Sequence, residues 1–482
     1  MTSFKSTTPI SEYKGYHGLP PLAGLHTMEG AIDCGLTVEE AVSRLKYTHW
    51  ALRRLHAIFI ARLAAMPIYE LKMTFSLHGH YCIEHVDGIF ARVREMRHPP
   101  FGMDVAPHEA LDFFFDEIQN AGDTEALVLG LYEKAIPQLV AAVRDQLEVT
   151  NRLYEHPTYR KLRHLLVELE DVEAYGQQAI ACLVDDTARA KHAGWLNLLD
   201  QSVANFGSFT GTEAKAEHAL AAQFSATPYV YDGKPQRDER FRDSYNMGVN
   251  PEAFIFRDDM PVRPKTLMMS FKRLREIDVP EMMSSIITET EGKPLGYYVD
   301  MTRQLWDEAR HAMMGEIGFV VNGIDWTQIP INFTWSLELN TGLKPEERHA
   351  ILFSIEQGLM AKETGKEKEW ELAVASTDRV SELIQDYDWA DEILHAKIGR
   401  DWFVKGFGTQ AEAVARGQEC VYRGFLQLAS GYKEAGLTEH RNWWPDLYTA
   451  ACEHWGVEPD AHVLAYDEFY DTSAPDLPTA KV

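Results

Sequence analysis

Hydrophobic residues recur every three or four positions along most of this chain, which is the spacing of one face of an α-helix. Runs of this kind extend from Thr37 to about residue 199 and return from Lys265 to about Tyr432. Between them the periodicity breaks into turn-rich segments. The pattern therefore predicts an all-α protein with two helical domains.

The points where the periodicity starts and stops divide the chain into five parts. We expect an N-terminal arm (1–35), a helical domain (36–200), a connector (201–264) with room for a short extended segment, a second helical domain (265–432), and a C-terminal tail (433–482) that is aromatic first and disordered in character at its end.

Two polar residues interrupt an apolar stripe in the second helical domain. Leu305, Ala312 and Phe319 share one helical face, and Glu308 and His311 fall on the same face. An unpaired buried carboxylate costs several kcal/mol or gives up its charge. Something must therefore compensate Glu308.

The triplet ExxH that contains Glu308 occurs twice more. Glu392 and His395 lie on a stripe with apolar residues at both ends, which predicts a buried position. Glu346 and His349 instead follow a proline that starts a helix, in a polar first turn. We therefore expect the triplet of Glu346 and His349 to be solvated.

Two single glutamates also fall on apolar helix faces. Glu281 lies in line with Ile277, and Glu356 follows Phe353 by three residues. Glu276 lies five residues before Glu281, and it stays open whether Glu276 takes the buried position instead of Glu281.

Taken in chain order, these residues read Glu, ExxH, Glu, ExxH. Glu281 and Glu308 lie at similar distances on either side of the turn EGKPLG, so an antiparallel helix pair would place them level. Two divalent cations would neutralise four converging carboxylates. The sequence predicts a dinuclear metal site with the ligands Glu281, Glu308, His311, Glu356, Glu392 and His395.

Three aspartates are expected to support these ligands. Asp307 and Asp391 each lie four residues before a ligand histidine and are candidate acceptors for an imidazole N–H, on the same helix or across the bundle. Asp388, on the stripe of Glu392, is assigned the same supporting role. The alternative that Asp307 and Asp391 are merely exposed acids stays open.

The first helical domain also carries a group of possible ligands, His78, His80, Glu84 and His85. Their spacings of two, four and five residues do not place all four on one helical face. A core or surface role is therefore favoured over a second metal site.

Composition narrows the choice of partner. The net charge of −26 over 482 residues argues against nucleic acid or an anionic membrane as the main partner and favours a neutral or cationic small molecule. Five scattered cysteines without a CxxC pattern favour a reducing cytoplasm. The sequence presents no signal-peptide pattern, no segment that approaches the ~20 apolar residues of a membrane span, and no nucleotide-binding motif.

The segments EIDVPE, WDEARHA, SIEQGL and DWADEILHAKIGRDW resemble the four ligand helices of the ferritin-like di-iron carboxylate superfamily. The form DEARH is similar to that of fatty acyl desaturases and of the small subunit of ribonucleotide reductase. The resemblance implies a ferritin-like bundle in the second helical domain. The first helical domain resembles a degenerate bundle of the same kind.

The resemblance and the oxygen-rich donor set together imply two iron ions, with manganese as the alternative at one or both positions. In the reductase subunit a radical tyrosine follows the glutamate of the first ExxH by seven residues, but Gly315 stands there in this chain. We therefore expect no radical-generating role. The missing side chain at Gly315 is expected to leave space for a substrate.

The expected function is O2-dependent oxidation of a small molecule, by hydroxylation, desaturation, N-oxygenation or oxidative cleavage. An electron-donor protein and a homodimer stay open as partners. Two alternatives remain: a non-enzymatic binding or scaffold protein stabilised by metal, and a tRNA-modifying hydroxylase, which the acidic charge disfavours.

Overall fold

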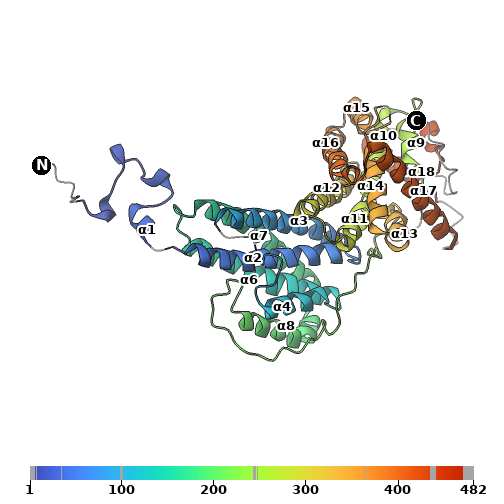
Figure 1. Ribbon diagram of the computed structural model, residues 1–482. Coiled ribbons are helices and arrows are strands. Elements are labelled where there is room, and N and C mark those ends of the chain that lie inside the picture. Colours follow the sequence, from blue (N-terminus) through green and yellow to red (C-terminus); the bar gives the residue numbers. More distant parts are fainter. Residues whose placement is uncertain are drawn as a thin grey trace. The chain divides into compact units, whose positions relative to one another are not determined.

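The computed structural model describes residues 6, 8–33, 35–97, 101–242, 246, 248–362, 364–434 and 441–469 (Figure 1). Within these residues the regular elements are all helical, and β pairing is limited to an isolated antiparallel bridge between Val249 and Phe469. The prediction of an all-α protein is confirmed for this part of the chain. Val249 of that bridge lies in the predicted connector.

The chain forms two compact units. The first contains residues 1–58 and 81–230, and the second contains residues 59–80 and 231–482. The change from one unit to the other falls within α2 (Val38–Leu63) and α3 (Tyr69–Glu95). The predicted connector is thus shared between the two units, and the finer domain boundaries remain a prediction.

The first unit is a helical assembly with an apolar core that includes Phe114, Leu127 and Trp195. Asp123 and Asp185 accept hydrogen bonds from the first-turn amides of Ala126 and Ala188 and so begin two of its helices. The elements that complete this unit are η1 (Ile10–Glu12), η2 (Tyr16–Gly18), η3 (Leu22–Gly24), α1 (Met28–Ile32), α4 (Glu109–Gln119), α5 (Thr124–Leu129), η4 (Gly130–Ala135), α6 (Ile136–Val149), α7 (His156–Leu183) and α8 (Asp186–Phe206).

One helical run in the first unit, Thr124–Val149, is long and apolar enough to cross a membrane. The expectation that no segment comes near this length and composition was therefore wrong. In the structure, 72% of its most apolar window is buried inside the fold. A core helix has the same composition because every side of it contacts other apolar residues.

The second unit is also helical. Its elements are α9 (Pro251–Ile255), α10 (Val262–Arg275), α11 (Asp278–Glu289), α12 (Leu295–Val320), η5 (Trp326–Gln328), α13 (Thr334–Gly342), α14 (Pro345–Leu359), α15 (Lys366–Ser376), α16 (Arg379–Trp402), η6 (Val404–Gly406), α17 (Gln410–Glu434), α18 (Trp444–Trp455) and α19 (Ala461–Leu464).

Four helices of the second unit contact one another in a closed order. Helix α11 packs against α12, α12 against α16, α16 against α14, and α14 against α11. Their inward faces carry the apolar stripes expected from the sequence, with Leu305, Ile351 and Ile398 buried between them. We call this arrangement the four-helix ring. Helix α10 packs against α12 beside the ring, and α15 packs against α10 and α16.

A break at Glu276 and Ile277 separates α10 from α11, and Pro280 lies in the first turn of α11. Pro280 has no N–H and cannot donate to the carbonyl of Glu276, four residues earlier. The amides of Glu276 and Val279 instead make tighter bonds to carbonyls three residues back, at 2.9 and 3.0 Å. The regular helix is therefore interrupted at Glu276 and Ile277, and one continuous helix through Glu281 does not form.

Gly315 is a packing residue and opens no space. A Cβ at this position would lie 2.1 Å from the amide nitrogen of Leu274 and 2.7 Å from the carbonyl oxygen of Ser270. Both atoms belong to the backbone of α10, which α12 approaches closely here. The expectation that Gly315 leaves room for a substrate was wrong, because the α10 backbone fills that space.

The aromatic part of the C-terminal tail belongs to the core of the second unit. Trp444 is fully buried, and its ring centroid lies 4.8 Å from that of Phe254. The terminal sequence SAPDLPTAKV, for which disorder was expected, lies outside the described residues.

We expect Gly315→Ala to destabilise the protein by about 1–3 kcal/mol, because the added methyl group has only rigid backbone to displace. Gly194→Ala is the matched control, since a Cβ at this position in α8 meets no atom within 4 Å. That change should stabilise the fold by up to about 1 kcal/mol through helix propensity. Denaturant unfolding of both variants tests the idea, and equal effects would contradict it.

Candidate metal centre

Seven acidic and histidine side chains meet inside the four-helix ring and at the α10–α11 break. Glu308 and His311 come from α12, Glu356 from the last turn of α14, and Glu276 from the break itself. Helix α16 supplies Asp388, Glu392 and His395. Apart from Glu276, whose side chain is 16% exposed, all of them are buried.

The seven side chains form two overlapping groups. One group contains Glu308, Glu356, Glu392 and His395, and we call it the His395 position. The other contains Glu276, His311, Asp388 and Glu392, and we call it the His311 position. Within each group one donor atom per residue lies within 4.8 Å of all the others. Glu392 belongs to both groups.

The two histidines direct the same ring nitrogen at the carboxylates. His395 Nδ1 lies 3.1 Å from Glu308 Oε1 and 3.2 Å from Glu392 Oε2. His311 Nδ1 lies 3.4 Å from Asp388 Oδ1, 3.5 Å from Glu276 Oε2 and 3.6 Å from Glu308 Oε2. Glu308 therefore turns one oxygen toward each histidine.

The other nitrogen of each imidazole faces an aspartate on the neighbouring helix. His395 Nε2 lies 3.4 Å from Asp307 Oδ2, and His311 Nε2 lies 3.2 Å from Asp391 Oδ2. Arg310 contacts both aspartates, at 2.9 Å for Asp391. Asp307 and Asp391 thus lie beside the imidazoles, and each comes from the other helix of the α12–α16 pair than its histidine. If each Nε2–H donates a hydrogen bond to its aspartate, Nδ1 is left free to bind a metal ion.

Two buried cations enter the same cluster, and the sequence pattern did not indicate either. Lys366 Nζ lies 2.7 Å from Glu392 Oε1 and 2.9 Å from Asp388 Oδ1. Arg273 contacts Asp388 through Nη1 and lies 3.0 Å from Glu276 through Nη2. Neither cation stands in an ExxH-like motif, so only the packing of α10 against α12 and α15, and of α15 against α16, reveals them.

Asp388 joins the cluster directly. It was assigned a supporting role, but its Oδ1 lies 3.4 Å from His311 Nδ1. The carboxylates of Glu276 and Glu308 lie 3.5 and 3.6 Å from the same nitrogen. Asp388 precedes Glu392 by four residues and His395 by seven, so it shares their helical face. From this spacing, the sequence alone could have predicted that Asp388 belongs to the cluster.

Electrostatics explain how the cluster is balanced without a metal ion. Burial opposes ionisation of Glu392, but Lys366 outweighs it and holds the pKa of Glu392 well below its usual range. Burial and the neighbouring Glu392 raise the pKa of Glu356 well above normal. Burial alone would lower the pKa of His311, but Asp388 and Asp391 raise it to about 10. Bound protons therefore neutralise part of the buried negative charge, and Lys366 and Arg273 neutralise another part.

Glu281 lies outside both metal-ligand groups. Its carboxylate pairs with Lys72 and with Arg237, whose Nη2 is 2.9 Å from Oε2, and it accepts a hydrogen bond from Ser336. These cations outweigh burial and lower the pKa of Glu281 to about 2. The assignment of Glu281 as a ligand assumed a continuous helix. The helix is instead interrupted at Glu276 and Ile277, and Glu276 lies beside His311.

The third ExxH triplet does not join the cluster. Glu346 is exposed at the start of α14, as expected, whereas His349 is buried between Tyr297 and Phe403, with ring centroids 5.9 and 5.8 Å away. The expectation that His349 is solvated was therefore wrong. Burial, with a smaller contribution from Lys293, lowers the pKa of His349 to about 4.

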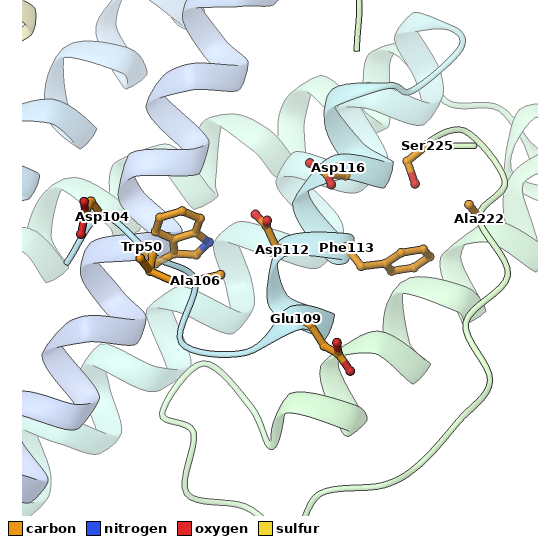
Figure 2. A pocket seen from close by; sticks show the side chains of 10 residues that line it. Trp50, Asp104, Ala106, Glu109, Asp112, Phe113, Asp116, Ala222 and Ser225 are labelled. Atoms are coloured by element: carbon orange, nitrogen blue, oxygen red, sulfur yellow. The ribbon is translucent and has the colours of Figure 1, made fainter. Parts of the chain in front are cut away.

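In the first unit, His85 pairs with Glu168 at 2.6 Å, and neither residue belongs to the two groups described above. A separate pocket of about 640 Å³ lies in the same unit, where Trp50 and Phe113 stand among several carboxylates (Figure 2). Arg54 binds two of those carboxylates, Asp112 and Asp116. The described lining of this pocket has no histidine or cysteine, and it belongs to a different unit from the metal centre.

Comparisons of this chain with models of protein families, with curated protein sequences and with solved structures found no match.

We expect the free energy of unfolding of His349→Phe to fall less in acid than that of the native protein. The metal content should stay unchanged. Folded His349 binds its proton only near pH 4, whereas the unfolded residue binds it near 6.5, so the folded state loses stability as the pH falls between these values. The loss at pH 4.5 is about 2–3 kcal/mol, which the variant should not show. Urea unfolding at pH 7 and pH 4.5 measures this difference, and parallel losses in both proteins would contradict the assignment.

Proposed function

We propose that this protein is an O2-dependent oxidoreductase that holds two iron ions, or manganese in place of one or both, in a ferritin-like bundle and oxidises a small molecule. The observation that carries the proposal is the paired arrangement of the donors. Two groups of carboxylates, each with one histidine Nδ1, share Glu392, and Glu308 faces both histidines.

The four-helix ring supports the bundle assignment. Helices α11, α12, α14 and α16 contact one another in cyclic order, and the carboxylates and imidazoles face the interior from three of them, with Glu276 entering at the break before the fourth. Carboxylate-bridged metal pairs in helical bundles are built in this way, from side chains on facing helices.

The donor atoms fit divalent ions. Atoms bound about 2.1 Å from one ion at octahedral or tetrahedral angles are about 3.0–3.4 Å apart. The separations from His395 Nδ1 to Glu308 and Glu392 are 3.1 and 3.2 Å, and that from His311 Nδ1 to Asp388 is 3.4 Å. Oxygen-rich donor sets with one imidazole for each ion suit iron and manganese.

Unsatisfied atoms support the same fit. His311 Nδ1, Glu276 Oε2 and Glu356 Oε2 are buried without a hydrogen-bond partner in the described part of the chain. Buried polar atoms normally have hydrogen-bond partners. Nitrogen and oxygen atoms that converge without such partners are therefore expected to share a cation. If all five carboxylates of the two groups were ionised, Lys366 and Arg273 would balance only part of their charge.

The protein's own residues have distinct roles in this proposal. Glu276, Glu308, Glu356, Asp388, Glu392 and the two histidines would hold the ions, which would supply the electrons for O2 reduction. Asp307 and Asp391 orient the imidazoles and fix the tautomer that leaves Nδ1 free. Glu276, with its partly exposed side chain, marks the side of the centre nearest to solvent.

We expect the purified protein to bind about two transition-metal ions per chain, and Glu392→Ala to lose at least one of them because Glu392 belongs to both positions. Glu346→Ala is the matched control, since this exposed glutamate belongs to the ExxH triplet outside the cluster. Elemental analysis of the two folded variants is the measurement. Full metal occupancy in Glu392→Ala, or loss of metal in Glu346→Ala, would show that the site is elsewhere.

We expect the protein loaded with ferrous iron under anaerobic conditions to consume O2 when air is admitted, because a centre that binds O2 must keep open coordination positions. An oxygen electrode measures the uptake, with the metal-free protein as the control. A protein that holds two ferrous ions and consumes no O2 beyond that control would have a structural metal site, and the enzymatic proposal would be wrong.

A further inference from the structure

Lys366 is built into the centre of the acidic cluster. It is the first residue of α15, and its side chain is fully buried. The ammonium lies 2.7 Å from Glu392 Oε1, 2.9 Å from Asp388 Oδ1 and 3.6 Å from Glu276 Oε1. A buried lysine is stable only where carboxylates surround it, and here those carboxylates are candidate metal ligands.

The contacts of Lys366 are unequally distributed between the two positions. All three carboxylates of the His311 position, Glu276, Asp388 and Glu392, lie within 4.0 Å of its ammonium. The His395 position shares only Glu392 with it. Among the described residues, neither Glu308 nor Glu356 forms an ion pair with a lysine or arginine, although Gln304 donates a hydrogen bond to Glu356.

A second cation strengthens this difference. Arg273 is fully buried and contacts Asp388 and Glu276, which both belong to the His311 position. Glu369, one turn after Lys366 on α15, pairs with Lys272 and lies 3.7 Å from Arg273. This network anchors α15 to α10, so the placement of Lys366 is supported by several contacts.

We propose that Lys366 is a tethered cation that makes the two metal positions unequal, so that the His395 position fills first and the His311 position accepts a metal ion only in competition with the lysine. The inference rests on the dinuclear site proposed above. It adds an order of loading and a residue that controls it.

The physical basis is repulsion between like charges at short range. A divalent ion at the His311 position would share three carboxylates with the ammonium, in a buried site where screening is weak. The ion must displace Lys366 or tolerate it, and either outcome lowers the affinity of that position. The flexible four-carbon stem of lysine permits such displacement.

Manganese(II) is a suitable probe, because the free ion is measured directly by electron paramagnetic resonance. The full chain is stripped of metal and titrated with Mn²⁺ at pH 7. We expect two binding steps whose dissociation constants differ by at least about tenfold. His311→Ala should abolish the weaker step and retain the tighter one. Loss of the tighter step in that variant, or two equal steps in the native protein, would overturn the proposal.

Lys366→Met removes the charge and keeps an unbranched stem, so the weaker step should tighten and the ratio of the two constants should fall at least about threefold, while Arg273 maintains part of the difference. Lys366→Arg keeps the charge and should keep the two steps separate. Lys72→Met is the matched control, because Lys72 is a fully buried lysine that pairs with Glu281, outside both metal groups and outside the network that anchors α15. Its two steps should stay as far apart as in the native protein.

The possible failures are distinguishable. If no variant and not even the native protein binds Mn²⁺ or Fe²⁺, the dinuclear site itself is wrong. If two ions bind and Lys366→Met leaves their separation unchanged, the dinuclear site stands and the role of Lys366 is wrong. Should Lys366→Met fail to fold, the native and His311→Ala titrations still decide the order of loading.

Discussion

The second unit depends on the compensation of buried negative charge. Five carboxylates converge beside a core of buried apolar residues, and such a group is stable only if each charge meets a proton, a cation or a metal ion. Lys366 and Arg273 supply two fixed positive charges. The raised pKa values of Glu356 and His311 indicate that bound protons supply a further part of the compensation. Binding of the proposed metal ions would therefore release protons from this centre.

Helical class and the core stripes were predictable from sequence, because burial of an amphipathic helix depends on the spacing of apolar residues and little else. The same spacing identified five members of the cluster on α12, α14 and α16. Each of these residues lies on a helix without an internal break, so its direction follows from its position in the sequence.

The errors arose where packing between elements decides the outcome. Glu281 was placed by continuing a helical face through Pro280, although a proline at that point removes the bond that the face depends on. Gly315 was interpreted as empty space, whereas a glycine also permits two helix backbones to come close together. Lys366 and Arg273 carry no periodic signal, since their partners come from other helices and only the folded chain brings them together.

Arg310 connects the two aspartates that support the histidines of the candidate metal centre. Its guanidinium holds Asp307 and Asp391 together, and these aspartates face His395 and His311 respectively. A rotation of one imidazole would pull on its aspartate and, through the shared arginine, on the support of the other. Arg303 also pairs with both aspartates, so two arginines outside the proposed ligand set link the supports of the two histidines, and a change at one proposed metal position would be felt at the other.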